Sequence, residues 1–401
     1  MKKKIIVIGL ILLIIVISVI SLRLTIFKDV TTIINLADNL SYEYNEQVYL
    51  YDTISIFDGQ IITENYLLDT DFVGTKEIEI KYKDSNKWKK TYKYRYEVED
   101  NTTPLLHVSN NLYVEVGKSE KDVLSKTFCG DNYDREVSLE IIGDLDLNTI
   151  GNYDVAIKAS DDNGNSVSKN TTIHVYQKSN YSNNNSNNNN NIKGVDISYF
   201  IKNYKTDNTA IGLDLSSYQN VSDFNLLKEN GVEFVILRIG WGPNEDMTFN
   251  TDNHFEDFYK RAKEAGLKVG VYYFSYATKL DEVDYEVNYV LDTLKDKEID
   301  LFISYDWENW NLFKDCHMNF VDLNKMATKF MSILKDKGYK AVNYSSKSYL
   351  ELIWDIDGFD TWLAHYNDET SYEKDFSIWQ ITDKGSIDGI DGLVDVDILY
   401  Y

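Results

Sequence analysis

Acidic residues follow several of the apolar runs in the second half of the chain. The clearest pair is Asp306 and Glu308, which flank Trp307 directly after the run Leu301–Tyr305. Side chains two apart on a strand point to the same face, with Cα atoms roughly 6.5 Å apart, so both carboxyls would lie over one cleft. Two neighbouring carboxyls of unequal pKa can cleave a glycosidic bond, because one donates a proton while the other stays ionised. The spacing therefore favours acid catalysis on a carbohydrate.

Two further apolar runs carry carboxylates. Asp214 lies in the first run after residue 210, and Asp395 and Asp397 lie in the last one. Solvated strand ends explain many such acids, and a calcium or magnesium site is a second interpretation. The sequence has no recognisable calcium loop, only five scattered histidines and two distant cysteines, which argues against a metal centre. We predict no metal and no cofactor.

Segments with the apolar pattern of strands alternate with segments that have the pattern of amphipathic helices, and these elements would position the acids. Strands are expected at Ile211–Leu215, Phe234–Ile239, Lys268–Phe274, Leu301–Tyr305, Ala341–Tyr344, Trp362–His365, Ser377–Ile381 and Val394–Leu399. Helices are expected at Ser222–Asn230, Asn253–Ala265, Asp281–Leu294 and Asp322–Lys337, with Ser222 as a helix cap. Repeated βα units predict a TIM-like α/β barrel over residues 194–401, irregular in its last third, with chemistry at the C-terminal strand ends.

The region before this domain reads as strands and contains a repeat. In each copy a glycine turn, at Gly74 and at Gly151, opens an alternating hairpin. We therefore predict two all-β sandwich modules, residues 31–100 and 103–176. They resemble the immunoglobulin-like repeats of bacterial surface proteins, which implies either a spacer or a wall-binding stalk. The asparagine-rich residues 177–193 are expected to be a flexible linker.

The first residues suggest a membrane anchor. Lys2, Lys3 and Lys4 precede the apolar run Ile5–Leu22, which as a helix would span roughly 27 Å. We predict that residues 1–28 form a cytoplasmic start and a single transmembrane signal anchor in the lipid bilayer of the cell membrane, with the rest of the chain outside. A cleaved signal peptide is the alternative.

Composition narrows the class of protein further. The 401 residues suggest two or three domains, and 43% hydrophobic residues can fill their cores. The formal net charge of −24 argues against a nucleic-acid partner, which would require a basic face. The sequence identifies no protein partner.

The second half of the chain resembles the family 25 glycoside hydrolases, the Ch-type lysozymes. The resemblance covers about residues 210–401 and includes GLDLSSYQ at Gly212–Gln219, YDWE at Tyr305–Glu308 and WLAHY at Trp362–Tyr366. Other matching segments are Gly231–Gly240, Ala265–Tyr272, Asn343–Ser345, Trp379–Gln380 and Gly389–Asp395. The resemblance implies an N-acetylmuramidase that cuts the β-1,4 bond of a peptidoglycan glycan strand between N-acetylmuramic acid and N-acetylglucosamine.

The resemblance also implies roles for single residues. Glu308 would be the proton donor and Asp306 its ionised partner, which assists the N-acetyl group or the oxocarbenium ion. Asp214 and Asp395 would complete an acidic floor, and Asp395 aligns better than Asp397. The implied substrate-binding residues are Tyr272, Tyr344, Trp362, Trp379 and Arg238. After Tyr272 the family often has a histidine, where this chain has Tyr273.

Two alternatives to this activity stay open. A non-catalytic wall-binding or adhesive surface protein could keep the cleft without turnover, although the retention of both Asp306 and Glu308 argues against it. A glycosidase with the same fold could act on another polysaccharide. His365 is expected to be a structural histidine more than a substrate contact, and His317 lies in a polar loop with no partner that the sequence suggests.

Overall fold

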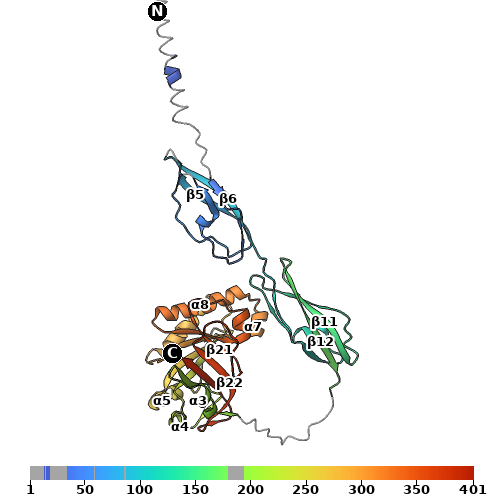
Figure 1. The fold of residues 1–401 in the computed structure, drawn as a ribbon, viewed down its shortest axis with the longest axis vertical. Coiled ribbons are helices and arrows are strands. Elements are labelled where there is room, and N and C mark those ends of the chain that lie inside the picture. Colours follow the sequence, from blue (N-terminus) through green and yellow to red (C-terminus); the bar gives the residue numbers. More distant parts are fainter. Residues whose placement is uncertain (1–12, 14, 19–33, 58, 85–86, 179–193) are drawn as a thin grey trace, which may run out of the picture. The chain divides into compact units, whose positions relative to one another are not determined.

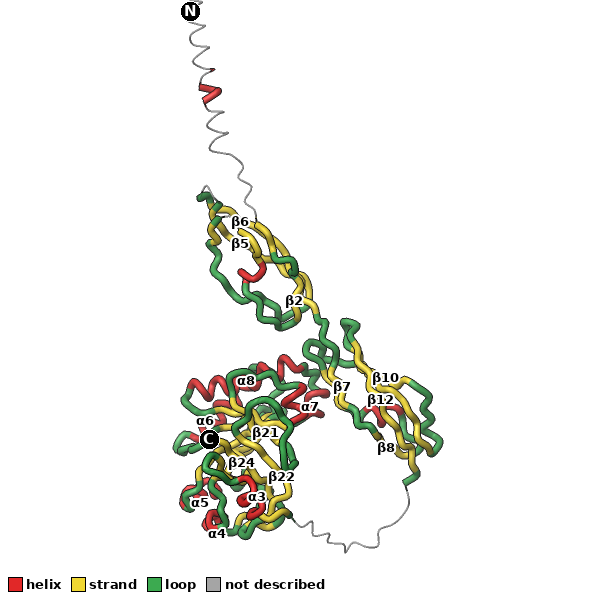
Figure 2. Tube along the Cα trace, in the orientation of Figure 1, coloured by secondary structure: helices red, strands yellow, loops and turns green. Residues whose placement is uncertain are grey.

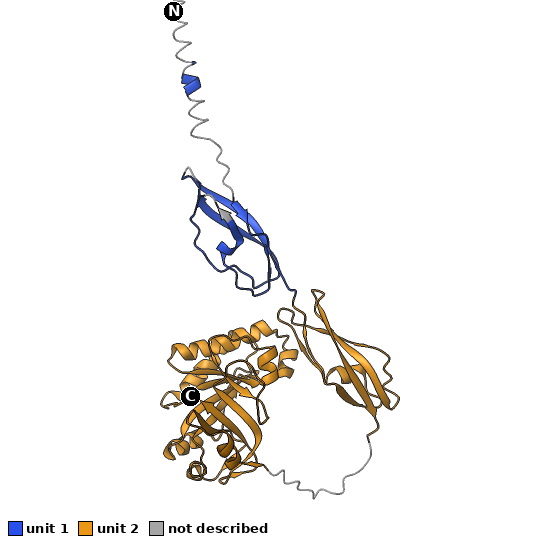
Figure 3. Ribbon diagram, viewed as in Figure 1, with its two compact units in different colours: residues 1–101 blue, residues 102–401 orange. Residues whose placement is uncertain are grey.

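The computed structural model describes residues 13, 15–18, 34–57, 59–84, 87–178 and 194–401. The chain divides into two compact units, residues 1–101 and 102–401 (Figure 3). Unit 2 contains a β-module, residues 102–176, and a larger C-terminal domain, residues 194–401. Each unit is described by itself.

Unit 1 is built on a long antiparallel hairpin, β5 (Gly74–Lys83) and β6 (Lys89–Glu99) (Figure 1). Alternate residues of the hairpin, among them Ile78, Ile80 and Val98, are buried, as expected for a sheet with one solvated face. The strands β2 (Ser41–Glu43) and β4 (Gln60–Ile61) extend this sheet, and β1 (Ile34–Leu36) pairs with β3 (Ile54–Phe57), beside the 3-10 helix η1 (Leu50–Thr53).

The β-module of unit 2 repeats this pairing scheme. Its hairpin is β11 (Gly151–Ser160) and β12 (Ser166–Tyr176), and the Asp161 carboxylate closes the turn by accepting from the backbone of Gly164 at 2.7 Å. The other elements are β7 (Leu105–His107), β8 (Asn111–Glu115), α2 (Glu120–Leu124), β9 (Phe128–Gly130) and β10 (Ser138–Ile142). In both modules one short strand runs parallel to the second hairpin strand, β2 beside β6 and β8 beside β12.

The C-terminal domain is a sheet that closes on itself. Seven strands run parallel in the order β14 (Thr209–Leu215), β16 (Phe234–Gly242), β18 (Lys268–Ser275), β19 (Ile303–Asp306), β20 (Ala341–Ser346), β21 (Asp360–Ala364) and β22 (Ile378–Ser386). The last strand, β24 (Val394–Tyr400), pairs antiparallel with both β14 and β22 and completes the ring. The short strands β13 (Val195–Asp196) and β17 (Asn250–Thr251) pair with β22 and β16, and β15 (Asn220–Val221) pairs with β23 (Ile390–Asp391).

Side chains pack on both faces of this sheet. The interior of the ring holds a small apolar cluster, Ala210, Phe234, Ile236, Phe302, Val342, Trp362, Ile378 and Leu399. A larger core lies between the outer face and the helices, which lie above and below the strands in the view of Figure 2. These helices are α3 (Ile197–Tyr204), α4 (Phe224–Glu229), α5 (Phe255–Glu264), α6 (Glu282–Leu294), α7 (Trp310–Asp315), α8 (Phe320–Asp336) and α9 (Lys347–Leu352). Helix α4 is capped by Asp223, whose carboxylate accepts from Asn225 N, and not by the predicted Ser222.

The predicted fold class is wrong for this domain. A TIM-like α/β barrel is all-parallel, with a helix after each strand. Here β24 is antiparallel to its neighbours, and no described helix separates β21, β22 and β24. The connection Ile387–Leu393 is too short for a crossover helix, so the chain returns antiparallel. Strands dominate the described part of the chain.

The predicted transmembrane helix is also not supported. No helix among the described residues is both long enough and apolar enough to cross a membrane. Most of the predicted span Ile5–Leu22 lies outside the described residues, as does most of the predicted linker 177–193.

Candidate active site

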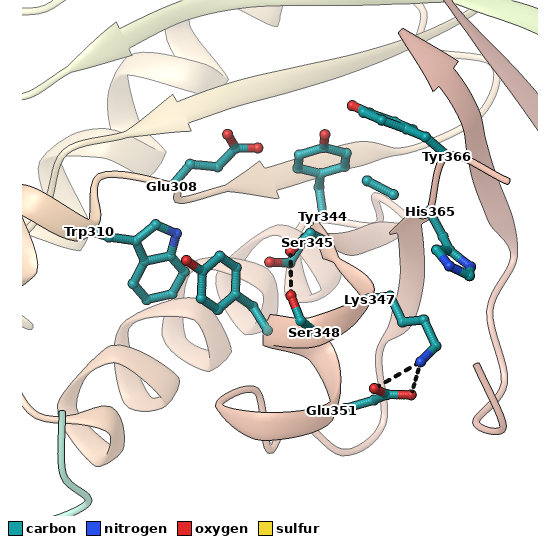
Figure 4. Close-up of a pocket in the computed structure, with 12 residues that line it drawn as sticks. Glu308, Trp310, Tyr344, Ser345, Lys347, Ser348, Glu351, His365 and Tyr366 are labelled. Carbon is teal, nitrogen blue, oxygen red and sulfur yellow. Dashed lines mark hydrogen bonds and ion pairs between the residues drawn. The ribbon is translucent and has the colours of Figure 1, made fainter. Parts of the chain in front are cut away.

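Two adjoining hollows lie where the parallel strands of the C-terminal domain end. The floor hollow, about 220 Å³, is lined by Asp214, Ser216, Tyr218, Gln219, Arg238, Tyr272, Phe274, Asp306, Glu308, Tyr344, Trp362, Tyr366, Gln380 and Asp395. The side hollow, about 530 Å³, is lined by Glu308, Trp310, Tyr344, Ser345, Ser346, Lys347, Ser348, Tyr349, Glu351, Ala364, His365 and Tyr366. Glu308, Tyr344 and Tyr366 line both hollows. Figure 4 shows Glu308 and Tyr344 in the side hollow, between Trp310 and Tyr366.

The predicted carboxylate pair differs in its local geometry from the expectation. Strand β19 ends at Asp306, and Glu308 belongs to the turn that leads into α7, where Trp310 N donates to Glu308 O at 2.9 Å. The two side chains are therefore brought together by a strand end and a turn, not by strand periodicity. Asp306 is buried, with 5% of its surface exposed, whereas Glu308 is exposed at the junction of the hollows. Both carboxyls line the floor hollow, and Glu308 is the more exposed of the two.

The pair is arranged to retain a proton. Burial raises the pKa of Asp306 well above its usual range, and the charges of Glu308 and Asp214 raise it further. Enclosure in the groove raises the pKa of Glu308, although hydrogen bonds with Asp306 and Tyr344 oppose this effect. Two coupled carboxyls lose their protons in two separate steps. The pair thus combines a proton donor with a partner that can carry negative charge.

Asp214 is tied into the site by the amide of Gln380. Gln380 Nε2 donates to Asp214 Oδ2 at 2.8 Å, and Gln380 Oε1 accepts from the hydroxyls of Tyr344 and Tyr366, both at 2.9 Å. Burial raises the pKa of Asp214 well above its usual range, and the nearby carboxyl of Asp397 adds to the shift. One amide therefore positions an acid and two tyrosines around the floor hollow.

The closing strand β24 supplies two more acids. Its register places Asp395 opposite Asp214 and Asp397 opposite Gln380. Burial, with the charges of Asp214 and Asp383, raises the pKa of Asp395 to about 8. Asp395 lines the floor hollow, as the predicted acidic floor requires.

Asp397, which aligns less well with the family than Asp395, lies beneath the floor hollow. It is fully buried and accepts a 2.8 Å hydrogen bond from Trp362 Nε1. Burial and the charge of Asp395 raise the pKa of Asp397 well above its usual range. Asp397 thus supports Trp362 and does not line either hollow.

Arg238 is the cation among the residues that line the floor hollow. Its guanidinium pairs with the buried carboxylate of Asp252, at 2.7 Å, and donates to Ser217 Oγ at 3.0 Å. It also lies over the rings of Tyr218 and Trp241, 5.0 and 5.1 Å from their centroids. The positive charge of Arg238 opposes the rise in the pKa of Asp306.

The predicted aromatic residues divide into two groups. Tyr272, Tyr344 and Trp362 line the floor hollow, with the Tyr344 and Trp362 rings 4.6 Å apart. Trp379 lines neither hollow: it packs in the outer core and donates to the backbone oxygen of His365 at 2.8 Å. Neighbouring side chains of a strand face opposite sides, so Gln380 points into the site and Trp379 away from it.

Two other residues singled out from the sequence make contacts within the protein, and His365 also lines the side hollow. Tyr273, at the position of the family's frequent histidine, is fully buried against Phe330 on the outer face. Both ring nitrogens of His365 are engaged, one with Thr370 Oγ1 at 2.9 Å and the other with Asn367 Nδ2 at 2.7 Å.

Sequence reasoning missed Gln380, Tyr366 and the exposed Tyr218 as parts of the site. All three lie in segments that carried the family resemblance, and those segments could have indicated that these residues belong to the site. Carboxyls of raised pKa are weak cation ligands, because they must lose a proton before they bind. That the site takes no metal and no cofactor stays a prediction.

The C-terminal domain is similar in sequence to known glycoside hydrolases. Residues 213–390 match the family model of glycosyl hydrolases family 25. A curated relative, an autolytic lysozyme of Clostridium acetobutylicum, is 28% identical over 189 residues, which cover 46% of this chain and 54% of that protein. The C-terminal part of the chain is thus similar to glycoside hydrolases. Its resemblance to family 25 is confirmed over residues 213–390.

The chain is also similar to several solved structures, with lower sequence identity than the curated relative. The modular autolysin LytC from Streptococcus pneumoniae, in complex with a synthetic peptidoglycan ligand, is 25% identical with a TM-score of 0.44, covering 49% of this chain and 48% of that chain. A family 25 glycosyl hydrolase from Bacillus anthracis is 20% identical with a TM-score of 0.43, covering 50% and 93%. The chain spans about half the length of the curated relative and of the pneumococcal autolysin. The resemblance of the β-modules to immunoglobulin-like repeats is not confirmed.

Proposed function

We propose that the C-terminal domain is a peptidoglycan hydrolase that cleaves the β-1,4 bond between N-acetylmuramic acid and N-acetylglucosamine. The observation that carries the proposal is the exposed Glu308 at the junction of two hollows, beside the buried Asp306. The family match over residues 213–390 and the autolytic lysozyme relative agree with this chemistry.

In the proposed mechanism Glu308 donates its proton to the glycosidic oxygen as the bond breaks. An acid does this best when its pKa lies near the working pH, and burial raises the pKa of Glu308 above its usual range. Positive charge then develops at the anomeric carbon. The coupled pair shares a proton, and with that proton on Glu308 the carboxylate of Asp306 stabilises this carbon or orients the N-acetyl group toward it. Water then adds to the anomeric carbon, and its proton returns to Glu308.

The two hollows would hold sugar units on either side of the bond. Tyr272, Tyr344 and Trp362 offer faces and edges to sugar rings in the floor hollow, and Tyr218 and Arg238 lie at its margin. We place this activity outside the cytoplasm, because peptidoglycan lies there. Cleavage of the C-terminal domain by protease added to wall-stripped cells with an intact membrane would support that location, and full protection would contradict it.

The activity is tested with the full chain on purified, dye-labelled peptidoglycan. Glu308→Gln keeps the shape of the side chain but cannot donate the proton, so we expect the rate of dye release to fall by about 10²–10⁴-fold. Glu264→Gln, on the exposed face of α5, is the matched control and should release dye at the wild-type rate.

Mass spectrometry of the released fragments identifies the bond. Muramidase products carry muramic acid at the reducing end. Equal release by wild type and Glu308→Gln would refute the assignment of the acid. Binding without release would favour a non-catalytic wall-binding protein, and fragments with another reducing end would point to a different glycosidase.

A further inference from the structure

We propose that the β-module of residues 102–176 supports the wall of the glycan groove. In this proposal, which rests on the proposed function, Phe128 is a positioning residue: it supports Trp310 and Tyr349, two aromatic side chains of the side hollow that holds Glu308. The module would then act on substrate binding through these rings, without itself touching the substrate.

Phe128 is the centre of an aromatic cluster that joins the module to the C-terminal domain. It follows α2 in the module, at the start of β9, and its ring meets Trp310 and Tyr349 edge-on, with centroids 5.2 and 5.7 Å apart. The rings of Phe313 and Phe320 complete the cluster, 6.2 and 6.3 Å from Phe128.

The backbone next to Phe128 fits closely against the same elements. A Cβ atom added to Gly130 would lie 2.6 Å from the ring of Phe320 and 2.9 Å from that of Phe313, so no larger residue fits without displacement. Phe320 N donates to Asp131 O at 2.8 Å, which ties the start of α8 to the module.

Polar contacts extend the fit beyond the aromatic cluster. Asn319 Nδ2 donates to Tyr133 O at 2.8 Å. Arg135 donates to His317 O at 3.0 Å and forms an ion pair with Asp322. His317, which had no partner in the sequence, also lies 3.2 Å from Glu136. The module therefore contacts both ends of the segment that leads from α7 into α8.

A short chain of contacts connects this interface to the proposed acid. The rings of Trp310 and Tyr349 lie 4.1 Å apart and both line the side hollow. Trp310 N donates to Glu308 O at 2.9 Å, which couples the position of Trp310 to the turn that carries the acid. Loss of support behind Trp310 and Tyr349 should loosen the wall of the groove and affect glycan binding more than the chemical step.

Gly130→Ala tests the inference in the full chain. The added methyl group should displace the module, so we expect KM for soluble glycan strands to rise about fivefold with kcat changed less than about twofold. Gly151→Ala is the matched control: it lies on β11 of the same module, and its added Cβ would make contacts of 3.4 Å or longer. It should leave both constants unchanged.

A double-mutant cycle tests the route through Trp310. Gly130→Ala should have little further effect on KM in a Trp310→Ala background, because residues that act through one contact are not additive. Additive effects of Gly130→Ala and Trp310→Ala would overturn the positioning role. Arg135→Ala, which removes interface contacts from outside the aromatic cluster, should raise KM in the same direction if Gly130→Ala does not fold.

Two readouts do not depend on turnover. In a Glu308→Gln background, the dissociation constant for uncross-linked glycan strands, measured by calorimetry, should rise about fivefold with Gly130→Ala and not with Gly151→Ala. Backbone amides of α7 should exchange hydrogen faster in Gly130→Ala. Unchanged glycan affinity would overturn the inference. A wild-type chain that binds glycan without cleaving it would refute the proposed function alone.

Discussion

The side-chain amide of Gln380 holds three polar groups of the site in place. It donates to Asp214 and accepts from Tyr344 and Tyr366. Gln380 is itself buried, at 4% exposure, so its partners have few other ways to satisfy their hydrogen bonds. A residue with no ionisable group thus organises the acidic floor.

Replacement of Gln380 should separate its contribution to stability from its contribution to glycan cleavage. Gln380→Met keeps the volume but removes every hydrogen bond, and we expect a loss of about 1–3 kcal/mol in the free energy of unfolding for each polar group left unsatisfied. Gln380→Glu keeps an acceptor for the tyrosines, removes the donor to Asp214 and adds a like charge, so the rate of glycan cleavage should fall more than the stability. Urea unfolding and dye release measure the two effects, and wild-type values in both variants would contradict this role.

The acidic residues of the site could be predicted individually from the sequence. Asp214, Asp306, Glu308 and Asp395 stand out because carboxylates that follow apolar runs have a plain chemical use. Gln380 does not stand out in this way, because an amide signals no reaction. The face on which a residue lies was not predictable for Trp379, which needs the register of β22 against its neighbours.

At the scale of elements, helix α6 holds a buried acid outside the site. Glu286 is fully buried, and its Oε1 accepts from Ser275 Oγ at 2.7 Å and from Ala277 N at 3.2 Å. Burial raises the pKa of Glu286 to about 8. The folded protein therefore holds a proton there over a pH range in which the unfolded chain has lost it.

This difference predicts the pH dependence of stability. Glu286 titrates near 4.5 in the unfolded chain and near 8 in the folded one, so between these values the unfolded state binds fewer protons. The free energy of unfolding should then decrease as pH rises, by at most about 1.4 kcal/mol per pH unit from this group. Glu286→Gln should remove this contribution.

Urea unfolding at pH 5, 6.5 and 8 measures the effect. The stability of Glu286→Gln relative to wild type should increase with pH, whereas Glu264→Gln on α5 should follow the wild-type curve. Parallel curves for wild type and Glu286→Gln would show that the carboxyl is already ionised in the folded protein.

Elements with strong periodicity were predicted with small errors in their bounds. The strands that became β14, β16, β18 and β24, and the helices α5 and α6, carry a clear pattern of apolar residues. The short helices α3, α7 and α9 were missed, because about two helical turns show little periodicity. Glu308 was interpreted as lying on the strand with Asp306, because residue spacing alone does not show where β19 ends.

At the scale of the whole molecule, the two units each have a core of their own. In unit 1, Leu50, Ile80 and Val98 are buried, and unit 2 has its cores in the β-module and around the closed sheet. Separate cores predict separate cooperative transitions in calorimetry. We expect at least two transitions for the full chain.

Single-core substitutions assign these transitions. Ile80→Ala should destabilise unit 1 by about 2–5 kcal/mol and lower one transition temperature only. Val271 in β18 is also fully buried, so Val271→Ala should lower the transition temperature of unit 2 only. The loss of stability should be smaller than for Ile80→Ala, because fewer atoms are removed. A joint shift of all transitions by either substitution would contradict independent units.

The sequence by itself determined the order of most strands and helices and the carboxylates that follow the apolar runs. These are properties of neighbours along the chain, because periodicity and chemical type are local. Only the tertiary structure decided that β24 closes the sheet antiparallel and brings Asp395 opposite Asp214. It also decided that Phe128 packs behind Trp310. Both contacts join residues far apart in the chain, and strand register and close packing select such pairs, which local sequence patterns do not specify.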